Sequence, residues 1–434
     1  HYEGISWDRR YPGSSDVESQ MYTPVAKVQE FLQEHRDKPF ILCEFAHAMG
    51  NSFGAVDKYV ELAYQDPLYQ GGFIWDFADQ AVWIDGDNGN GYFAFGGESG
   101  ESPNDGAFCG NGIVFADRTP KPMYQELKHL YQGLKITVDE SSFRVENRYL
   151  STPSSDFKCV ATLSKAGMLI AEGRVVTDVL PGHSETYKLP FTVPTDPGEY
   201  VIDVSFRLKE DTRWARTDFE VAYAQDVVVR PGASLAPNSP SILLAGAPGE
   251  EPPVALVEDL KVVNGIHNVG VHGDGFSALF SKLAGGLQSY RFGGGPEGGQ
   301  ELLTAVPMPN FWHAPTDNSE GWGGPAEDGQ WLLASRYAIA EKGLDQPVVT
   351  TSDEGVEVTF DYLLPTTPPS KCKVTYLVTA SGRVQVTMHL DPGEGLGPAP
   401  EFGMLFRTLG SFNHLTWYGE GREESSVDRR LGAR

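Results

Sequence analysis

The sequence lacks any long apolar run. No stretch approaches the ~18 consecutive apolar residues that a membrane-spanning helix needs, which argues against an integral membrane protein built from helices. Basic residues are also scarce, because 34 Lys and Arg stand against 59 Asp and Glu, for a net charge of −25. Nucleic acids and anionic membrane surfaces select basic patches, so neither is expected as a partner. The acidity fits a soluble enzyme that acts on an uncharged substrate.

Cysteine is rare and is not arranged for chemistry. The four cysteines, Cys43, Cys109, Cys159 and Cys372, are scattered, and none forms a C-x-x-C pair. Because several of them lie in apolar, strand-like runs, we expect buried free thiols. No zinc site follows from this spacing.

The sequence has neither an initiator Met nor a signal peptide, since it opens on His1-Tyr-Glu-Gly. The opening resembles the middle of a motif, so we expect a fragment or a processed chain. Without a signal peptide, the expected location is cytoplasmic.

What the sequence does contain favours several domains rich in loops. A length of 434 residues suggests about two to four domains. The 49 Gly and 30 Pro are typical of barrels and sandwiches and not of helical bundles. We therefore expect a multidomain chain that combines α/β and all-β parts.

Residues 1–132 alternate strand and helix signals. Such alternation predicts parallel strands joined by crossover helices, and about four strands make up half of an eight-stranded barrel. Half a barrel leaves strand edges exposed and cannot close a core by itself. The expected strands are 1–3, 20–23, 40–44 and 71–76, and the expected helices are 24–37 and about 54–65.

From residue 133 the pattern changes to alternation with a period of two. Strands about 8–12 residues apart, with no helix between them, predict a β-sandwich of immunoglobulin or fibronectin type over 133–225. The segment 226–253 is rich in Pro and Gly and predicts a linker. Residues 254–434 are again rich in strand signals and predict a larger β-sandwich. Within it, the Gly-rich run at 292–299 lacks the Lys-Ser/Thr of a phosphate-binding loop, and we interpret it as a hairpin loop.

The strand at 40–44 ends on a carboxylate, Glu44, and a Gly/Asn/Ser loop begins at Gly50. Barrel enzymes place catalytic groups at the carboxyl ends of buried strands. A lone glutamate buried there costs several kcal/mol unless it is paired or protonated. The alternative is a structural glutamate that pairs with a nearby arginine.

Several blocks around Glu44 resemble the large bacterial β-galactosidases of glycoside hydrolase family 2. Ile41-Leu-Cys-Glu44-Phe-Ala-His47-Ala-Met-Gly-Asn-Ser52 is similar to the nucleophile motif of that family. Agreement continues through Gly71-Gly-Phe-Ile-Trp75-Asp-Phe-Ala-Asp79-Gln80 and through Asn104-Asp-Gly-Ala-Phe108-Cys-Gly-Asn111. Pro309-Asn-Phe-Trp312-His-Ala-Pro-Thr-Asp317-Asn318 resembles a block of the family's last domain. The blocks follow the order and spacing of the family over most of the chain.

The resemblance implies hydrolysis of terminal β-D-galactosides with retention, which uses a nucleophile and an acid/base about 5–5.5 Å apart. Glu44 matches the nucleophile, and Tyr22 matches a tyrosine whose hydroxyl steadies that carboxylate. His47 matches a residue that hydrogen-bonds sugar hydroxyls, and Trp75 matches the platform under the sugar's apolar face. Taken singly, three of these residues have a structural interpretation. Tyr22 is then a core aromatic residue, His47 a core or capping residue, and Trp75 a residue of barrel packing.

The resemblance also implies metals and a loop. Phe108, through its carbonyl, and Asn111, through its amide oxygen, match a Na⁺ site. Asn104 matches a secondary Mg²⁺ position, and the main Mg²⁺ ligands are expected outside this chain. Asp317-Asn318-Ser-Glu320-Gly321 matches the start of a mobile loop near the active site, with a polar hairpin of no function as the alternative.

The resemblance further implies that parts are missing. The acid/base glutamate of the family precedes the block that opens this chain, and Glu3 stands in a barrel-strand setting and is no substitute. About a hundred residues of the last domain are expected after Arg434, so that sandwich is truncated. We therefore expect this polypeptide to be inactive without the missing N-terminal half or a complementary chain, and the complete protein to be a homo-oligomer.

Two alternatives stay open. One keeps the mechanism and changes the sugar to a β-glucuronide or β-mannoside, although the His-Ala-Met-Gly-Asn-Ser block favours galactose. The other is an assembly subunit that complements another polypeptide and performs no chemistry alone. The set of Glu44, Tyr22, His47 and Trp75 argues against a purely structural role.

Overall fold

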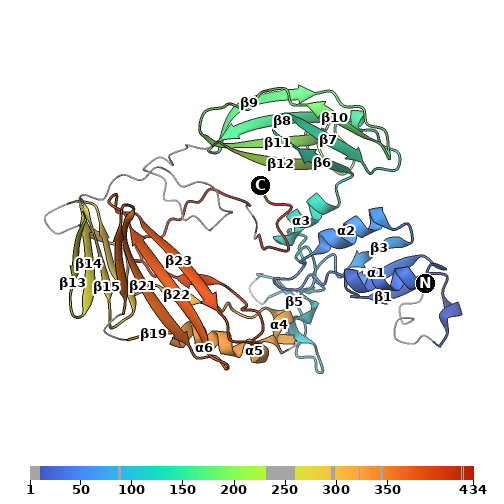
Figure 1. Cartoon of the computed structure of the whole chain (residues 1–434). Coiled ribbons are helices and arrows are strands. Elements are labelled where there is room, and N and C mark those ends of the chain that lie inside the picture. The colour runs from blue at the N-terminus through green and yellow to red at the C-terminus, as the bar shows by residue number, and fades with distance from the viewer. Residues whose placement is uncertain are drawn as a thin grey trace. The chain divides into compact units, whose positions relative to one another are not determined.

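The computed structural model describes residues 10–86, 89–230, 260–294, 299–321, 323–342, 346–421, 423 and 425–434 (Figure 1). The strand expected at residues 1–3, together with Glu3, lies outside these residues. The chain divides into two compact units. The first contains His1–Glu250 together with Trp417–Arg434, and the second contains Glu251–Thr416.

The first unit begins with a parallel sheet whose strand order is β1-β2-β3. These strands are β1 (Glu18–Met21), β2 (Phe40–Phe45) and β3 (Tyr69–Ile74). The crossovers are the helices α1 (Val25–Glu34) and α2 (Val56–Gln65), so the alternation expected from the sequence is present. Parallel neighbours require such long connections because a tight turn can only reverse the chain.

The apolar stripe of each crossover helix explains why it packs on the sheet. Val28 and Leu32, one turn apart on α1, are buried in one cluster with Phe40 and Leu42 of β2. Among the described residues, β1 and β3 each pair only with β2, so the sheet is open at both edges.

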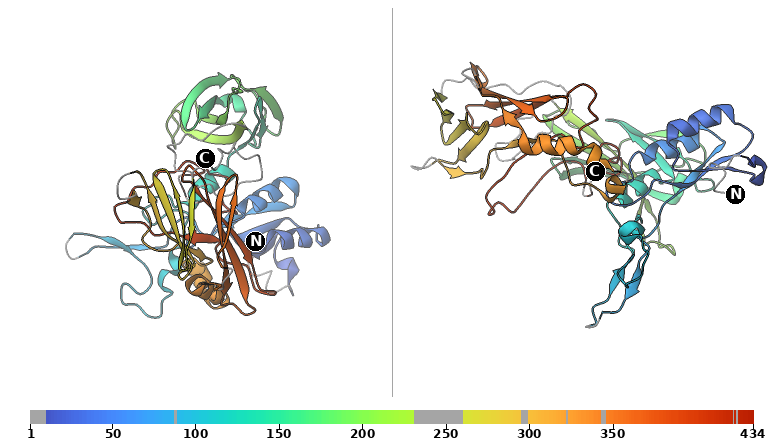
Figure 2. Two further views of the ribbon diagram at one scale, coloured as in Figure 1. Left: turned by 60° about the vertical axis from the view of Figure 1, so that its left-hand side comes forward. Right: turned by 90° about the horizontal axis from the view of Figure 1, so that it is seen from below.

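An antiparallel hairpin and two helices follow the sheet. Strands β4 (Val82–Ile84) and β5 (Tyr92–Ala94) form the hairpin, which extends away from the sheet (Figure 2). The short 3-10 helix η3 (Gly106–Cys109) and the helix α3 (Met123–Leu130) lead to the next strands.

A β-sandwich completes the first unit. Its two antiparallel sheets, ordered β10-β7-β6 and β12-β11-β8-β9, enclose one buried cluster. In β11 the alternate side chains Tyr200, Ile202, Val204 and Phe206 are fully buried, which is the expected period of two. The strands are β6 (Leu134–Val138), β7 (Ser142–Asn147), β8 (Phe157–Lys165), β9 (Met168–Val175), β10 (Ser184–Lys188), β11 (Gly198–Leu208) and β12 (Glu220–Arg230).

The linker expected over 226–253 is wrong at its start. Strand β12 continues to Arg230, which pairs with Gly198 of β11, and Val228 packs against the buried cluster of the sandwich. The valine-rich end of β12 is therefore part of the sandwich. Residues 231–253 lie outside the described residues.

The second unit contains two larger antiparallel sheets that share one core. One sheet has the order β13-β14-β15-β16-β17 and the other β19-β21-β22-β23, with β20 paired to β21. Phe280 of the first sheet lies 5.3 Å from Tyr376 of the second, measured between ring centroids. The strands are β13 (Lys261–Asn264), β14 (Asn268–Gly273), β15 (Phe276–Ser281), β16 (Gly286–Phe292), β17 (Gln300–Glu301), β19 (Ile339–Ala340), β20 (Val348–Ser352), β21 (Gly355–Leu364), β22 (Ser370–Val378) and β23 (Val384–Asp391).

Two connections in this unit bear on the sequence predictions. The Gly-rich run joins β16 and β17, which pair in antiparallel fashion, so the predicted hairpin is confirmed. Residues Asp317–Gly321 form the short helix α4 and not the polar hairpin considered for them, while the match to the start of a mobile loop stays a prediction. The remaining elements are β18 (Met308–Asn310), β24 (Gly403–Leu405), α5 (Gly324–Glu327) and α6 (Gly329–Tyr337).

The domain expected over 254–434 also needs a correction at its end. Trp417–Arg434 belongs to the first unit, not to the second. The backbone N–H of Ala55 donates to the carbonyl of Asp428 at 2.8 Å, and that of Gly432 donates to Glu126 at 2.6 Å. Such bonds to buried backbone groups explain why this segment leaves the strands that precede it.

The four cysteines are free thiols, as expected, although only Cys159 and Cys372 are buried, whereas Cys43 and Cys109 are half-buried. None of the helices in the described ranges has the length and apolarity required to cross a membrane.

Candidate active site

Glu44 is the penultimate residue of β2 and lies at the carboxyl end of this central strand. Phe40, Leu42 and Phe45 of the same strand are buried, whereas Glu44 is half-buried. The strand therefore fixes the backbone of Glu44 in the core and leaves its carboxylate at the open end of the sheet.

Tyr22 follows β1 directly and is tied to Glu44 twice. Its backbone N–H donates to the carbonyl of Glu44 at 2.9 Å, and its hydroxyl donates to the carboxylate of Glu44. Burial, and then the bond and the negative charge of Glu44, raise the pKa of Tyr22 well above its usual value. The phenol is therefore protonated at neutral pH and is a hydrogen-bond donor to the carboxylate.

His47 lies in the loop after β2, beside the same pair. Its ring meets that of Tyr22 edge to face, with 6.1 Å between centroids, and lies 5.6 Å from the ring of Phe108. The hydroxyl of Ser52 donates to the carbonyl of His47, which closes the loop on itself. Tyr22, Glu44 and His47 thus gather at the carboxyl ends of β1 and β2.

Trp75 follows β3 and brings the third strand end to the same place. Its N–H donates to the carbonyl of Phe45 at 3.0 Å, and its carbonyl accepts from the N–H of Ala48 at 2.8 Å. These bonds join the end of β3 to the residues on either side of His47. The carboxyl ends of parallel strands meet at one edge of a sheet, as the sequence prediction required.

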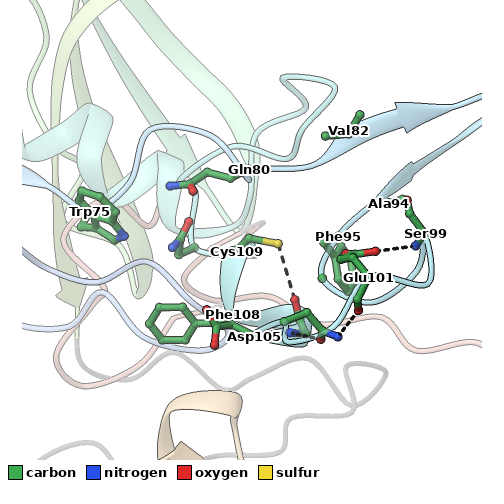
Figure 3. Close-up of a pocket in the computed structure, with 14 residues that line it drawn as sticks. Trp75, Gln80, Val82, Ala94, Phe95, Ser99, Glu101, Asp105, Phe108 and Cys109 are labelled. Carbon is green, nitrogen blue, oxygen red and sulfur yellow. Dashed lines mark hydrogen bonds between the residues drawn. The ribbon is translucent and has the colours of Figure 1, made fainter.

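A pocket of ≈ 420 Å³ opens beside Trp75 (Figure 3). Aromatic faces and polar groups alternate in its wall, a mixture that suits a sugar, which has apolar C–H faces and a ring of hydroxyls. Glu44, Tyr22 and His47 are not part of this wall, although Phe108, which is, contacts His47. The lining residues are Trp75, Gln80, Val82, Ala94, Phe95, Gly96, Ser99, Glu101, Asn104, Asp105, Gly106, Phe108, Cys109 and Asn111.

Sequence reasoning found Trp75, Phe108, Asn104 and Asn111 but missed the other polar members of the wall. Glu101 accepts backbone N–H bonds from Gly97 at 2.6 Å and Ser99 at 3.1 Å. These bonds, that of Gly97 foremost, lower the pKa of the Glu101 carboxyl. The run of Gly and Ser around Glu101 was the available signal, since such residues allow a loop to fold around a carboxylate.

Asn111 is buried, and its amide oxygen is left without a hydrogen-bond donor in the part of the chain that the structure describes. Its side chain is 2% exposed, and its Oδ1 has no hydrogen-bond partner among the described residues. The adjacent Gly112 donates to Asp79, which also pairs with Lys121 at 2.6 Å, so the segment is firmly held. A buried amide oxygen without a donor is costly unless another group, such as a cation, satisfies it.

Asn104 fits a metal less well. Its amide nitrogen donates to the carbonyl of Glu101 at 2.9 Å, and its amide oxygen accepts from Gly106 at 3.1 Å. The side chain is already used to shape a turn. Within the described ranges, no group of three or more His, Cys, Asp or Glu side chains is placed to hold a metal ion.

Three protein-family models match consecutive parts of the chain. The TIM barrel domain of glycosyl hydrolases family 2 matches residues 1–136, domain 4 of β-galactosidase matches 143–228, and the β-galactosidase small chain matches 272–434.

Curated relatives match the whole chain. A β-galactosidase of Clostridium acetobutylicum is 35% identical over 434 residues, which is 100% of this chain and 45% of that protein. β-Galactosidases of Halalkalibacterium halodurans and Streptococcus thermophilus are 38% and 35% identical, again over 100% of this chain and 41% of each protein. The chain thus spans less than half the length of these relatives.

Among solved structures, a β-glucuronidase of Parabacteroides merdae with glycerol in its active site aligns over 87% of this chain and 43% of that chain. The sequence identity is 11% and the TM-score is 0.21, which carries no argument about the fold. The relationship of this chain to known families therefore rests on the family models and on the identities over the full chain. Consecutive parts of the chain thus match the TIM barrel domain of glycosyl hydrolases family 2 and two domains of β-galactosidases, and the whole chain is similar to part of several β-galactosidases.

Proposed function

We propose that this chain carries the nucleophile and part of the sugar site of a retaining β-galactosidase. The observation that carries the proposal is the pairing of Glu44 with the hydroxyl of Tyr22 at the carboxyl end of β2, next to a pocket walled by Trp75. The curated relatives that match the whole chain carry the name β-galactosidase.

In the proposed reaction, the carboxylate of Glu44 attacks the anomeric carbon and forms a galactosyl ester, while the bond to the leaving oxygen breaks. Water then attacks the same carbon and breaks the ester. The sugar leaves with its original anomeric configuration, and the carboxylate of Glu44 is restored. Tyr22 steadies the carboxylate by its hydrogen bond before the attack and again when the ester is cleaved. It loses no proton in either step, because its raised pKa keeps the phenol neutral.

The proposed reaction also needs an acid that gives a proton to the leaving oxygen and later takes one from water. Among the described carboxyls near Tyr22, Asp76 is already engaged: one oxygen accepts from its neighbour Phe77 and the other from Gln80 at 2.9 Å. The family resemblance implies that the acid/base is a glutamate outside this chain, and on that ground we propose that the chain alone is inactive. General acid catalysis is typically worth about 10²–10⁴-fold in rate.

His47 and Trp75 are the proposed contacts to the sugar. The imidazole of His47 can accept from one galactose hydroxyl and donate to another, and the indole of Trp75 offers a flat face to the C–H groups. The proposed preference for galactose over a β-glucuronide or a β-mannoside rests on the His-Ala-Met-Gly-Asn-Ser block that follows Glu44.

We further propose that Asn111 and the carbonyl of Phe108 hold Na⁺. The buried Oδ1 of Asn111, which lacks a partner among the described residues, supports this assignment. A bound cation would supply positive charge that orients sugar hydroxyls. Asn104, whose amide is used in a turn, is a weaker candidate for a secondary Mg²⁺, and the main Mg²⁺ ligands are assigned outside the chain.

The parts of the chain are assigned in the same way. We place residues 1–132 in the second half of a TIM barrel, 133–230 in an immunoglobulin-like sandwich and 254–434 in the β-galactosidase small chain, whose family model matches 272–434. The open sheet β1-β2-β3 and the two-sheet sandwich support the first two assignments.

The test is covalent trapping with 2-deoxy-2-fluoro-galactosyl fluoride, followed by mass spectrometry of the full-length protein and of this chain alone. An adduct on Glu44 of the full-length protein, and none on the isolated chain, is the expected result. An adduct on another carboxylate would overturn the assignment of Glu44. A labelled isolated chain would contradict its proposed inactivity.

A panel of nitrophenyl glycosides separates the sugars. We expect hydrolysis of the β-galactoside and not of the β-glucuronide or β-mannoside. Mixing this chain with a fragment that carries the acid tests the alternative of a complementing subunit, because recovered activity that is insensitive to Glu44→Gln would make the chain a structural partner only.

A further inference from the structure

Residues Ser426–Arg434, which we call the docking segment, lie against two parts of the first unit. At one end, the carbonyl of Asp428 accepts from the N–H of Ala55 at 2.8 Å. The approach is close, because a Cβ on Gly54 would lie 1.8 Å from a carboxylate oxygen of Asp428. Glycine at this position therefore allows the docking segment to reach the loop between β2 and α2.

Arg429 contacts this loop and is buried, with 4% of its surface exposed. Its guanidinium donates to the carbonyl of Ser52 and to the Oδ1 of Asn51, the latter at 2.5 Å. Ser52 in turn donates its hydroxyl to the carbonyl of His47. A continuous series of hydrogen bonds thus runs from Arg429 to the residue that we place at the sugar.

The backbone of this loop needs outside support. Ala46, Phe53 and Ala55 have φ of 51°, 77° and 58°, in the left-handed region that residues with a Cβ disfavour. Such conformations persist only where the surroundings hold them. Phe53 directly follows Ser52, which Arg429 binds, and Ala46 follows Glu44 by two positions.

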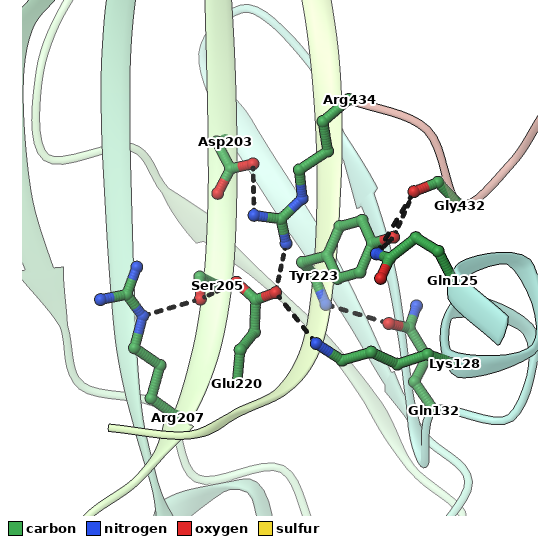
Figure 4. A network of polar contacts seen from close by, with 10 residues as sticks. All are labelled: Gln125, Lys128, Gln132, Asp203, Ser205, Arg207, Glu220, Tyr223, Gly432 and Arg434. Carbon is green, nitrogen blue, oxygen red and sulfur yellow. Dashed lines mark hydrogen bonds and ion pairs between the residues drawn. The ribbon is translucent and has the colours of Figure 1, made fainter. Parts of the chain in front are cut away.

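At its other end, the docking segment is fixed to α3 and to β12 (Figure 4). The N–H of Gly432 donates to Glu126, and its carbonyl accepts from the hydroxyl of Tyr223 at 2.6 Å. The guanidinium of Arg434 lies over the ring of Tyr223 at 3.6 Å and pairs with Glu220. The segment is therefore anchored on rigid elements just after the residues that contact the loop.

We propose that Arg429 is a positioning residue for the nucleophile: the docking segment uses it to hold the loop 46–55 in the conformation that aligns Glu44 and His47. This inference rests on the proposed function of Glu44. Arg429 does not itself touch the sugar, and acts through Asn51 and Ser52.

A planar guanidinium suits this task because it donates to two acceptors at fixed angles, whereas a lysine ammonium is a point donor on a flexible stem. Without it, the half-buried carbonyl of Ser52 loses its donor, and the loop is free to relax. A displacement of about 1 Å at a reacting group can cost about 10²-fold in rate.

The experiment measures the second-order rate of trapping by 2-deoxy-2-fluoro-galactosyl fluoride in the full-length protein. We expect Arg429→Met to lower this rate about 10²-fold per folded molecule, and Arg429→Lys to lower it less. The matched control is Arg434→Met, which loosens the same docking segment at its other anchor and should lower the melting temperature without slowing the trapping. Equal slowing by Arg429→Met and Arg434→Met, or none, would overturn the inference.

Asn51→Ala removes the side-chain oxygen that accepts a hydrogen bond from Arg429. This variant gives a second measurement, which can be made even if Arg429→Met does not fold. If Arg429 acts through Asn51, the effect of Arg429→Lys is smaller in the Asn51→Ala background than in the wild type. Additive effects would contradict this coupling. Wild-type protein that is not labelled on Glu44 would overturn the proposed function itself, a result distinct from a labelled wild type with unaffected variants.

Discussion

In the sandwich formed by β6–β12, large side chains such as Tyr200 and Phe206 have no exposed surface, whereas around β3–β5 Phe73, Phe77 and Trp83 are more than half exposed. Both regions have similar aromatic residues, but the sandwich uses them to fill its own core. In the region of β3–β5, Phe73 and Phe77 are exposed on β3 and just after it, and Trp83 is exposed on the hairpin. Apolar content therefore does not separate an element that fills its own core from one that leaves aromatic faces exposed.

The two regions also differ in their loops. Tyr22, Ala46, Phe53 and Ala55 adopt positive φ within the strand ends that surround Glu44. In the sandwich, Ala166 has a positive φ in the tight turn between β8 and β9. Strained backbone in the first region gathers where the chemistry is proposed, whereas in the second it serves a turn. Substitutions in the first region should change rates, and those in the second should change stability.

The largest expected effect comes from Glu44→Gln in the full-length protein. An amide cannot attack the anomeric carbon, so kcat should fall by more than about 10³-fold. The melting temperature should hardly change, because the side chain is only half-buried and keeps its shape. A rate within about tenfold of the wild type would refute the role of Glu44.

The reverse result is expected for Phe206→Ala in the core of the sandwich. Removing a fully buried aromatic ring should lower the free energy of unfolding by about 3–5 kcal/mol, measured by urea unfolding. The kcat of the remaining folded protein should not change. A loss of kcat without a loss of stability would remove the distinction between the two regions.

Tyr22→Phe should have an intermediate effect. It deletes the hydroxyl that donates to Glu44 and keeps the ring that meets His47. A hydrogen bond to a charged group is worth about 1.5–3 kcal/mol, which corresponds to about 10–100-fold in rate. Steady-state kinetics over the pH range checks this, and His47→Phe serves as a comparison that keeps a ring but removes the sugar contact.

The smallest expected effect is a change of folding stability with pH, which comes from His129 in α3. Burial, with help from the charge of Arg434, lowers the pKa of His129 from 6.5 to about 4. Between these values the unfolded chain binds a proton that the folded chain does not, so stability falls as the pH falls from about 6.5 to about 4. The loss is at most about 3 kcal/mol, because the ring is only partly shielded from water.

Urea midpoints at several pH values measure this loss. His129→Gln should flatten the dependence on pH, whereas His183→Gln, at an exposed histidine of the sandwich, should leave it unchanged. An equal slope in both variants would show that His129 is not the group that titrates.

The sequence alone predicted the elements that have a clear period. The strands β1–β3 with their helices, and the sandwich strands such as β11, follow directly from the spacing of apolar residues. It also marked Glu44, because a carboxylate at the end of a buried strand is unusual. It misjudged the end of β12, where the Pro and Gly that follow hid a strand whose pairing with β11 only the folded sheet reveals.

What the sequence determined by itself is the kind of residues available: the motifs of the family, the strand that carries Glu44 and the aromatic and amide groups nearby. The family resemblance also predicted that Tyr22 meets Glu44. Only the tertiary structure decided that Arg429 contacts Ser52, a contact that spans most of the chain. No local period records such a contact, because it depends on where distant segments come to lie once their backbone groups are satisfied.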